Sequence, residues 1–242
     1  GGEYYKGRVY GFTYTFIDCY SSPYSFIRID PATGARQTLN LVESEGGTMD
    51  SNIVYDMAYS YKDGVMYAIK STSEGAMLTT GKLSNPNAGT HREVGIITNG
   101  PTRYIALACH LRGDLYAMGV DARLYKIDMD NLQATLVGST GIFSLTMDIQ
   151  SMAFDHNSGT LYWATADGNL YIIDHYTGRT RLAGQLSSYS GIGVTCLFTL
   201  FNNVEEGTPG MAEAFVVATG DNGGISSSLQ WINPSQTAQG VD

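Results

Sequence analysis

The stretch Leu145–Leu186, LTMDIQSMAFDHNSGTLYWATADGNLYIIDHYTGRTRLAGQL, decides the fold. It reads as four short apolar strands separated by three clusters of turn residues. The predicted strands are Ile149–Phe154, Thr160–Thr165, Asn169–Asp174 and Arg179–Ala183. The clusters between them contain Gly, Asn and Asp, which adopt the positive φ angles that tight hairpins require. The stretch therefore predicts a four-stranded antiparallel meander.

Similar units recur on both sides of this stretch. Complete four-strand patterns lie within Ile53–Ile97 and Tyr104–Gly138. The first unit, Gly7–Val42, and the last, Val194–Ile232, each show three predicted strands, and Gly1–Lys6 is too short for a full inner strand. A period of ~40–50 residues with four strands per unit is typical of β-propeller blades.

The sequence therefore predicts an all-β fold, a β-propeller of four-stranded antiparallel blades. Five blades are preferred, with the two incomplete units meeting at the seam so that no sheet edge stays exposed; four or six blades are the alternatives. Residues 1–232 are predicted to form a single propeller domain. Residues 233–242, NPSQTAQGVD, read as a linker-like tail, which indicates that the chain is part of a larger multidomain protein.

A turn motif supports this interpretation and carries a family resemblance. Ile173-Asp174-His175-Tyr176-Thr177-Gly178 matches Ile29-Asp30-Pro31-Ala32-Thr33-Gly34, and Ile127-Asp128 occupies the same place between them. Together with the Tyr-Ala or Trp-Ala strands before it, the pattern resembles secreted β-propellers of the YVTN and quinoprotein-like repeat type. The resemblance implies a fold and an extracellular or cell-surface location. The tryptophan docking motif of quinone-binding repeats is absent, so no cofactor is predicted.

Composition excludes several classes of partner. The formal net charge is −9, which speaks against binding to nucleic acid or to an anionic membrane. No apolar run approaches the ~20 residues of a membrane helix, so membrane insertion is not predicted. The cysteines Cys19, Cys109 and Cys196 are widely spaced and lack metal-binding spacing. Cys109 and Cys196 lie in apolar strands, where a free cysteine is usually a small buried hydrophobe.

No catalytic residue and no metal site are predicted. Nucleophile-elbow, phosphate-loop and dinucleotide-binding motifs are absent. The four histidines occupy four different places in the repeat and are not expected to converge: His91, His110, His156 and His175.

Polar residues in the connections that enter the inner strands are the predicted ligand-binding site. A propeller brings these connections together at one mouth of its central channel, where loops on a rigid scaffold can bind a ligand. The alternative is that these residues only hydrogen-bond strand ends and channel water. The predicted site consists of Asp50, Asn52, Arg103, Tyr104, Asp148, Gln150 and Tyr189.

The function predicted from these features is a non-enzymatic extracellular or cell-surface module for binding or adhesion, with a protein or carbohydrate ligand. The alternative is a glycosidase-type propeller hydrolase in which Asp50 and Asp148 supply the paired carboxylates at the channel mouth. The alternating apolar residues of the inner strands are predicted to be buried between blades: Met57, Tyr59, Leu107, Cys109, Met152, Phe154, Cys196 and Phe198.

Overall fold

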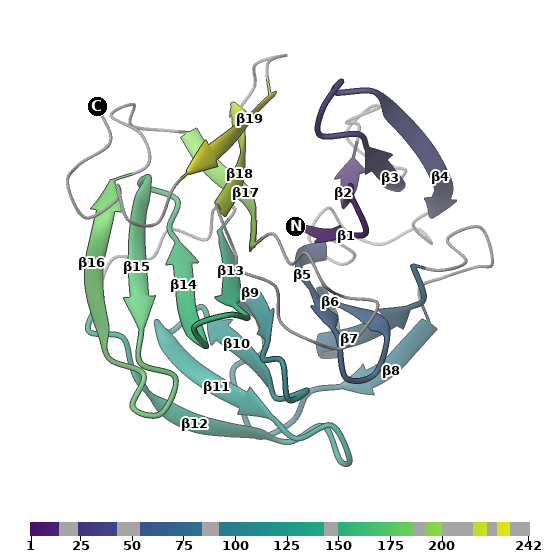
Figure 1. Ribbon diagram of the computed structural model, residues 1–242. Coiled ribbons are helices and arrows are strands. Elements are labelled where there is room, and N and C mark those ends of the chain that lie inside the picture. The colour runs from purple at the N-terminus through teal and green to yellow at the C-terminus, as the bar shows by residue number, and fades with distance from the viewer. Residues whose placement is uncertain are drawn as a thin grey trace.

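The structure is a ring of five antiparallel β-sheets around a central axis (Figure 1). It is a computed structural model that describes residues 1–14, 24–42, 54–83, 92–142, 150–185, 192–199, 215–221 and 227–232. Four of the sheets are four-stranded blades, and the fifth has three strands. The described part of the chain contains no helix, so the predicted all-β propeller of four-stranded blades is confirmed.

Each sheet is a meander in which consecutive strands pair. The first contains β1 (Gly2–Tyr5), β2 (Arg8–Tyr14), β3 (Tyr24–Ile29) and β4 (Arg36–Val42). The second contains β5 (Val54–Ser60), β6 (Val65–Thr72), β7 (Gly75–Gly81) and β8 (Arg92–Ile96). The third contains β9 (Tyr104–Cys109), β10 (Leu115–Gly119), β11 (Arg123–Ile127) and β12 (Ala134–Ser139). The fourth contains β13 (Ser151–Asp155), β14 (Thr160–Ala164), β15 (Asn169–Ile173) and β16 (Thr180–Gln185). The fifth contains β17 (Ile192–Thr199), β18 (Phe215–Asp221) and β19 (Ser227–Ile232).

The first strand of every sheet lies innermost and packs beside the first strands of its two neighbours. β5 packs against β1 and β9, β13 packs against β9 and β17, and β17 packs against β1, so the ring closes. Apolar clusters fill each of the five spaces between adjacent sheets. All eight residues predicted as core are buried: Met57, Tyr59, Leu107, Cys109, Met152, Phe154, Cys196 and Phe198.

The closure of the ring differs from the prediction. Gly1–Lys6 was expected to be too short for an inner strand, but β1 pairs with β2 from Gly2 opposite Gly11 to Tyr5 opposite Arg8. The first blade is therefore complete by itself and shares no strand with β17–β19. The first and fifth sheets meet through side-chain packing. The aromatic rings of Tyr4 and Phe198 stack there with centroids 5.8 Å apart. Glycine permits this approach, because a Cβ on Gly2 would lie 3.0 Å from the Cβ of Cys196.

Buried side chains satisfy backbone groups along the inner strands. Each inner strand is the edge of its own sheet, so N–H groups that point to the channel lack a partner in a neighbouring strand. The carboxylate of Asp56, which is 0% exposed, accepts hydrogen bonds from the N–H groups of Leu107 and Met152, both at 3.0 Å. It also accepts one from the Ser151 hydroxyl at 2.9 Å. One side chain of β5 therefore binds both β9 and β13.

Two further hydrogen bonds extend this network around the channel. The Ser151 hydroxyl oxygen accepts a hydrogen bond from the N–H of Leu197 on β17 at 2.9 Å. On the other side, the carboxylate of Glu3 on β1 accepts one from the N–H of Tyr59 on β5 at 3.1 Å. We call Glu3, Asp56 and Ser151 the channel network, since together they connect all five inner strands.

The packing predicts that Phe154→Ala destabilises the fold strongly. Phe154 is 2% exposed and fills the space between the third and fourth blades, so its truncation should lower the free energy of unfolding by ~3–5 kcal/mol. Leu182→Ala is the control, because Leu182 is 59% exposed and its loss should change stability by less than ~0.5 kcal/mol. Urea denaturation measures both values. Equal midpoints for the two variants would contradict the assigned packing.

The two carboxyl groups of the channel network contribute less to stability as pH rises. Burial raises the pKa of Glu3 from its ordinary value of 4.5 to about 8, and that of Asp56 from 3.8 to about 7. Between pH ~4.5 and ~8 these two groups retain protons in the native state that they release in the unfolded chain, so their contribution to the free energy of unfolding decreases with pH, whereas the histidines whose pKa burial lowers contribute an increase. Urea midpoints at pH 5 and pH 8 for the parent and for Glu3→Gln isolate the part due to Glu3: the change from pH 5 to pH 8 should be more favourable to stability in the variant. An equal change in both proteins would exclude this role of Glu3.

Candidate functional site

The predicted site at the channel mouth is only partly described. Asp50, Asn52, Asp148 and Tyr189 lie outside the described residues, so their convergence stays a prediction. The three described members are Arg103, Tyr104 and Gln150.

Two of these three residues are buried. Tyr104 is 1% exposed, and its ring packs edge-on against that of Tyr125 at 5.7 Å. Gln150 is also 1% exposed, and its side-chain oxygen accepts a hydrogen bond from Nε1 of Trp163 at 3.0 Å. Arg103 is partly exposed, and its carbonyl oxygen accepts a hydrogen bond from the N–H of Val120 at 3.3 Å.

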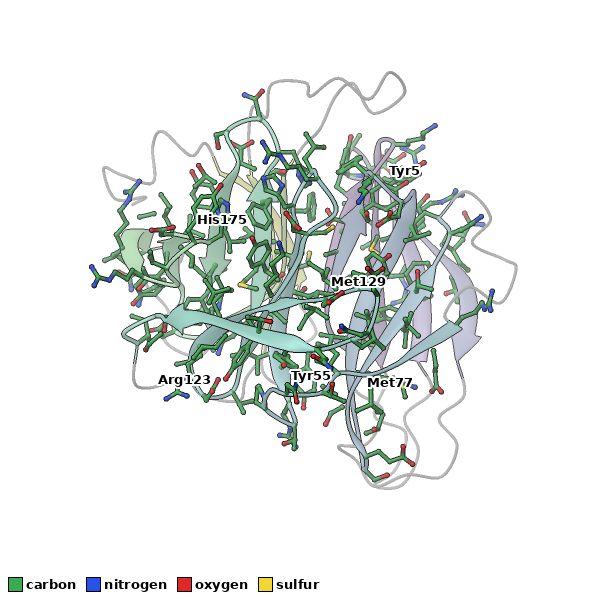
Figure 2. All side chains as sticks on the ribbon, turned by 90° about the horizontal axis from the view of Figure 1, so that it is seen from below. Tyr5, Tyr55, Met77, Arg123, Met129 and His175 are labelled. Carbon is green, nitrogen blue, oxygen red and sulfur yellow. The ribbon has the colours of Figure 1, made fainter. Side chains whose placement is uncertain are left out.

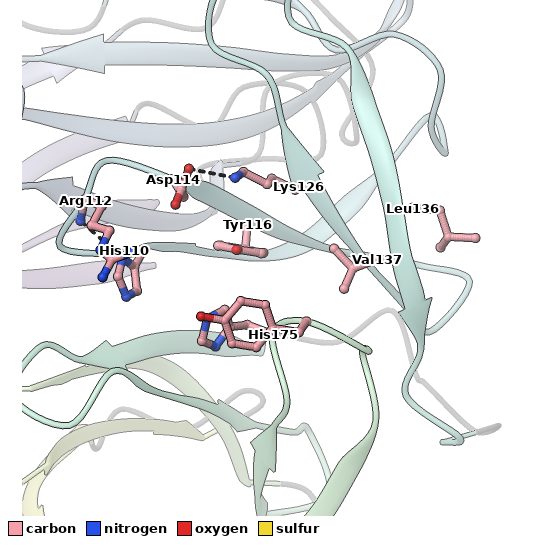
Figure 3. Close-up of a pocket in the computed structure, with 9 residues that line it drawn as sticks. His110, Arg112, Asp114, Tyr116, Lys126, Leu136, Val137 and His175 are labelled. Carbon is pink, nitrogen blue, oxygen red and sulfur yellow. Dashed lines mark hydrogen bonds and ion pairs between the residues drawn. The ribbon is translucent and has the colours of Figure 1, made fainter.

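A pocket of about 340 Å³ lies between the outer parts of the third and fourth blades (Figure 3). It is on the face of the ring that carries the turns after the first and third strands of each blade. The third blade contributes the turn after β9 and side chains of β10, β11 and β12, and the fourth contributes the turn between β15 and β16. The lining residues are His110, Arg112, Asp114, Tyr116, Lys126, Leu136, Val137, His175 and Tyr176.

The turn between β15 and β16 owes its shape to the Asp-x-x-Thr-Gly motif. The carboxylate of Asp174 accepts hydrogen bonds from the N–H of Tyr176 at 2.9 Å and from the Thr177 hydroxyl at 2.7 Å. These bonds hold the pKa of Asp174 below its ordinary value. Gly178 closes the turn at φ 75°, in the left-handed region that favours glycine. His175 and Tyr176 are therefore presented on a short, internally bonded turn.

This turn rests directly on the third blade. A Cβ on Gly178 would lie 2.6 Å from the carbonyl carbon of Gly138 in β12, and a Cβ on Gly138 would overlap the carbonyl oxygen of Thr177. Beside this contact, the Thr180 hydroxyl donates a hydrogen bond to the carbonyl oxygen of Thr140 at 2.7 Å. Because residues 138 and 178 are glycines, the backbones of the third and fourth blades touch at this point. The contact holds the turn that carries His175 and Tyr176 against β12.

Two histidines converge in the pocket, contrary to the expectation that the histidines lie apart. The ring centroids of His110 and His175 are 5.7 Å apart, and both rings pack edge-on against Phe154, at 5.0 and 5.5 Å. The physical reason is that the turns after first and third strands share one face, so neighbouring blades bring them side by side. Burial lowers the pKa of both imidazoles. His91 lies outside the described residues.

Cations and one carboxylate form the polar part of the lining. Lys126 and Asp114 form an ion pair at 2.7 Å, which raises the pKa of the lysine and lowers that of the aspartate. Arg112 is exposed, and its backbone N–H donates a hydrogen bond to Nδ1 of His110 at 3.2 Å. With neutral imidazoles, the lining carries two cations and one anion, on a chain whose formal net charge is −9.

The outer part of the lining is apolar and open to solvent, and the ring of Tyr176 packs against that of His175 with centroids 4.1 Å apart. Tyr176 is 78% exposed and Leu136 is 50% exposed, two of the most accessible large hydrophobic side chains among the described residues. Val137 lies between Leu136 and the interior of the pocket (Figure 3). Tyr116 forms the floor and packs edge-on against His175 at 5.7 Å. A ligand with both an apolar surface and a charged group fits such a lining.

The described residues do not offer the elements of several catalytic sites. They hold no group of three or more His, Cys, Asp or Glu side chains that could bind a metal ion. Cys109 and Cys196 are buried, as predicted, and burial raises the pKa of the Cys109 thiol to about 12, so that it stays protonated and unreactive. No helix able to cross a membrane occurs in the described segments.

Comparison with known proteins gives a fold without a family. No protein-family model and no curated protein matches the chain. Similar solved structures include nidogen in a nidogen/laminin complex, 13% identical with a TM-score of 0.53 over 90% of this chain and 74% of that one. TolB from Acinetobacter baumannii is 10% identical with a TM-score of 0.54 over 96% of this chain and 51% of TolB.

A structural genomics protein of unknown function from Bacteroides thetaiotaomicron is 10% identical, with a TM-score of 0.53 over 86% of this chain and 52% of that one. This chain thus spans about half the length of TolB and of the Bacteroides protein. At such identities the likeness shows the fold alone. It confirms the resemblance to repeat-type propellers at the level of the fold.

The contact between the two glycines predicts the effect of Gly138→Ala. The added methyl group must push the turn between β15 and β16 away from β12, so the N–H groups of Tyr176 and Gly178 should exchange with solvent faster. Gly141→Asn is the control, because Gly141 has φ 76°, which asparagine tolerates, and open space around it. Hydrogen exchange followed by mass spectrometry measures the turn in each variant. Unchanged protection in Gly138→Ala would contradict the contact.

Proposed function

We propose that this protein is a non-enzymatic binding module that acts outside the cell or at its surface, and that its ligand occupies the pocket between the third and fourth blades. The observation that carries the proposal is the composition of this pocket. Charged groups and imidazoles line it together with the exposed side chain of Tyr176, whose ring packs against that of His175 with centroids 4.1 Å apart. Exposed aromatic side chains next to fixed polar groups are typical of recognition sites.

The rigidity of the lining supports binding over a structural role. The turn that presents His175 and Tyr176 is bonded internally through Asp174 and seated on Gly138 of the next blade. A preorganised wall reduces the entropy lost when a ligand binds. The nidogen structure of similar fold is that of a complex with laminin, which makes a protein ligand one choice beside a carbohydrate.

The pocket offers little for the alternative, a glycosidase-type hydrolase. Hydrolysis of a glycosidic bond requires two carboxyl groups ~5–9.5 Å apart. The lining of this pocket contains one, Asp114, and that carboxylate is engaged by Lys126. Asp50 and Asp148, the carboxylates predicted for hydrolysis, lie outside the described residues. Binding is therefore the function that the described geometry supports best.

The test is a screen of the isolated protein against a glycan array and a panel of extracellular proteins, followed by titration of the best ligand. Tyr176→Ala and Arg112→Gln should each weaken binding by roughly tenfold, which corresponds to ~1.4 kcal/mol. Both residues are exposed, so neither change should affect folding.

Arg123→Gln is the matched control, since Arg123 is an exposed arginine of the same blade. Figure 2 shows Arg123 and His175 toward opposite faces of the ring. The control should bind like the parent. If both pocket variants also bind like the parent, the ligand does not use this pocket. Release of a cleaved product from the ligand would favour the hydrolase instead.

A further inference from the structure

We propose that the pocket binds a carboxylated sugar residue, with its carboxylate among Arg112, Lys126 and the two imidazoles, and that binding is accompanied by proton uptake on His110 or His175. This inference rests on the proposed function and specifies the ligand of the same site. Three features carry it: the balance of charge in the lining, the pairing of the two imidazoles, and the exposed ring of Tyr176 that packs against one of them.

The charge of the lining favours one negative charge on the ligand. Arg112 and Lys126 supply two cations against the single carboxylate of Asp114, so the lining is positive by one charge with neutral imidazoles. A monoanion balances that charge. A phosphate dianion would prefer several unopposed cations, but here Asp114 lies 2.7 Å from Lys126 and would repel it. The geometry of the arginine fork also matches a planar carboxylate.

The two imidazoles can take up protons and so add positive charge to the pocket. Nδ1 of His110 accepts the hydrogen bond from the N–H of Arg112, so the proton of the neutral ring belongs on Nε2. Protonation of His110 is opposed first by burial and then by its neighbours His175, Arg112 and Lys126, while Asp114 favours it. The pKa of His110 is therefore lowered in the free protein. His156 also interacts with His110, but burial lowers the pKa of His156 to about 4, so it stays neutral at pH 5.5 and above.

The pKa of His175 is also lowered in the free protein. Burial lowers its pKa, Lys126 lowers it further, and Asp174 and Asp114 oppose the decrease. A bound carboxylate adds a negative charge next to both rings and so raises their pKa values. The complex then holds more protons than the free protein, and by linkage the affinity must increase as pH falls below neutrality.

The exposed ring of Tyr176 points to a sugar as the carrier of the carboxylate. Sugar rings have C–H faces that pack on exposed aromatic side chains, and Tyr176, which is 78% exposed, offers such a surface beside His175. The volume of about 340 Å³ is at the lower end of the ~300–1,000 Å³ range of small-molecule sites. A single sugar residue at the end of a chain suits this size.

The experiment compares an oligogalacturonate with its methyl ester, which keeps the sugar rings and removes the charge. Isothermal titration at pH 5.5 and pH 7.5 should show that the free acid binds at least roughly tenfold more tightly than the ester at pH 5.5. Affinity for the acid should also be severalfold higher at pH 5.5 than at pH 7.5.

Variants assign these effects to residues. Arg112→Gln should lower affinity for the acid by roughly tenfold and leave the weak binding of the ester unchanged. The double variant His110→Gln/His175→Gln should bind the acid with the same affinity at both pH values. Arg123→Gln, on the other face, should match the parent in all titrations. Thermal unfolding of each variant verifies that it is folded.

The outcomes separate this inference from the proposed function. Equal binding of acid and ester, with both weakened by Tyr176→Ala, would overturn the anionic ligand and leave the pocket as a binding site. Tighter binding of a sulfated oligosaccharide or of inorganic phosphate would overturn the carboxylate. If neither galacturonate form binds, the assignment of a sugar ligand is overturned. The proposed function fails only if an identified ligand binds the pocket variants as tightly as the parent.

Discussion

The closed ring depends on the hydrogen bonds that the carboxylate of Asp56 accepts at its centre. Five sheets meet around one axis with their edge strands innermost, and edge strands carry backbone N–H groups without a ladder partner. An unpaired buried N–H costs ~1–3 kcal/mol, so a closed ring needs acceptors at its centre. Asp56 serves two neighbouring strands through Leu107 and Met152, and Ser151 and Glu3 continue the network to β17 and β1.

Burial of the carboxyl groups of the channel network costs free energy, which the apolar packing between the blades offsets. Burial of two carboxyl groups raises their pKa values, which shows that the ionised forms are disfavoured in the channel. The inner strands compensate because both of their faces are buried, as in β9, where every residue from Tyr104 to Cys109 is covered. Apolar side chains between blades supply the stability, and the polar centre holds the strands at a common level. The turns of adjacent blades are thereby brought into a fixed relation, on which the pocket depends.

The sequence predicted the repeat well and the channel poorly, for physical reasons. Turn chemistry is local, so Gly159, Gly168 and Gly178 mark hairpins that the structure confirms at positive φ. Asp56 looked like one polar residue in an apolar strand, and its partners lie 51 and 96 residues away in the chain. A charged residue in the middle of a predicted inner strand was the available signal. The pairing of His110 with His175 also requires the order of blades around the ring, which periodicity alone does not provide.

The repeated turn motif separates the residues that build the scaffold from those that line the pocket. In three blades an aspartate carboxylate accepts a hydrogen bond from the N–H two residues later, at 2.9 Å in each case, in the turns that begin at Asp30, Asp128 and Asp174. The two residues that follow the aspartate are Pro-Ala, Met-Asp and His-Tyr, and they contribute nothing to this bond through their side chains. The turn therefore forms with three different pairs of residues at these two positions. In the fourth blade the positions carry an imidazole and an exposed phenol, both in the lining of the pocket. The side chains that line the pocket from this turn are thus carried on a backbone whose shape other residues determine.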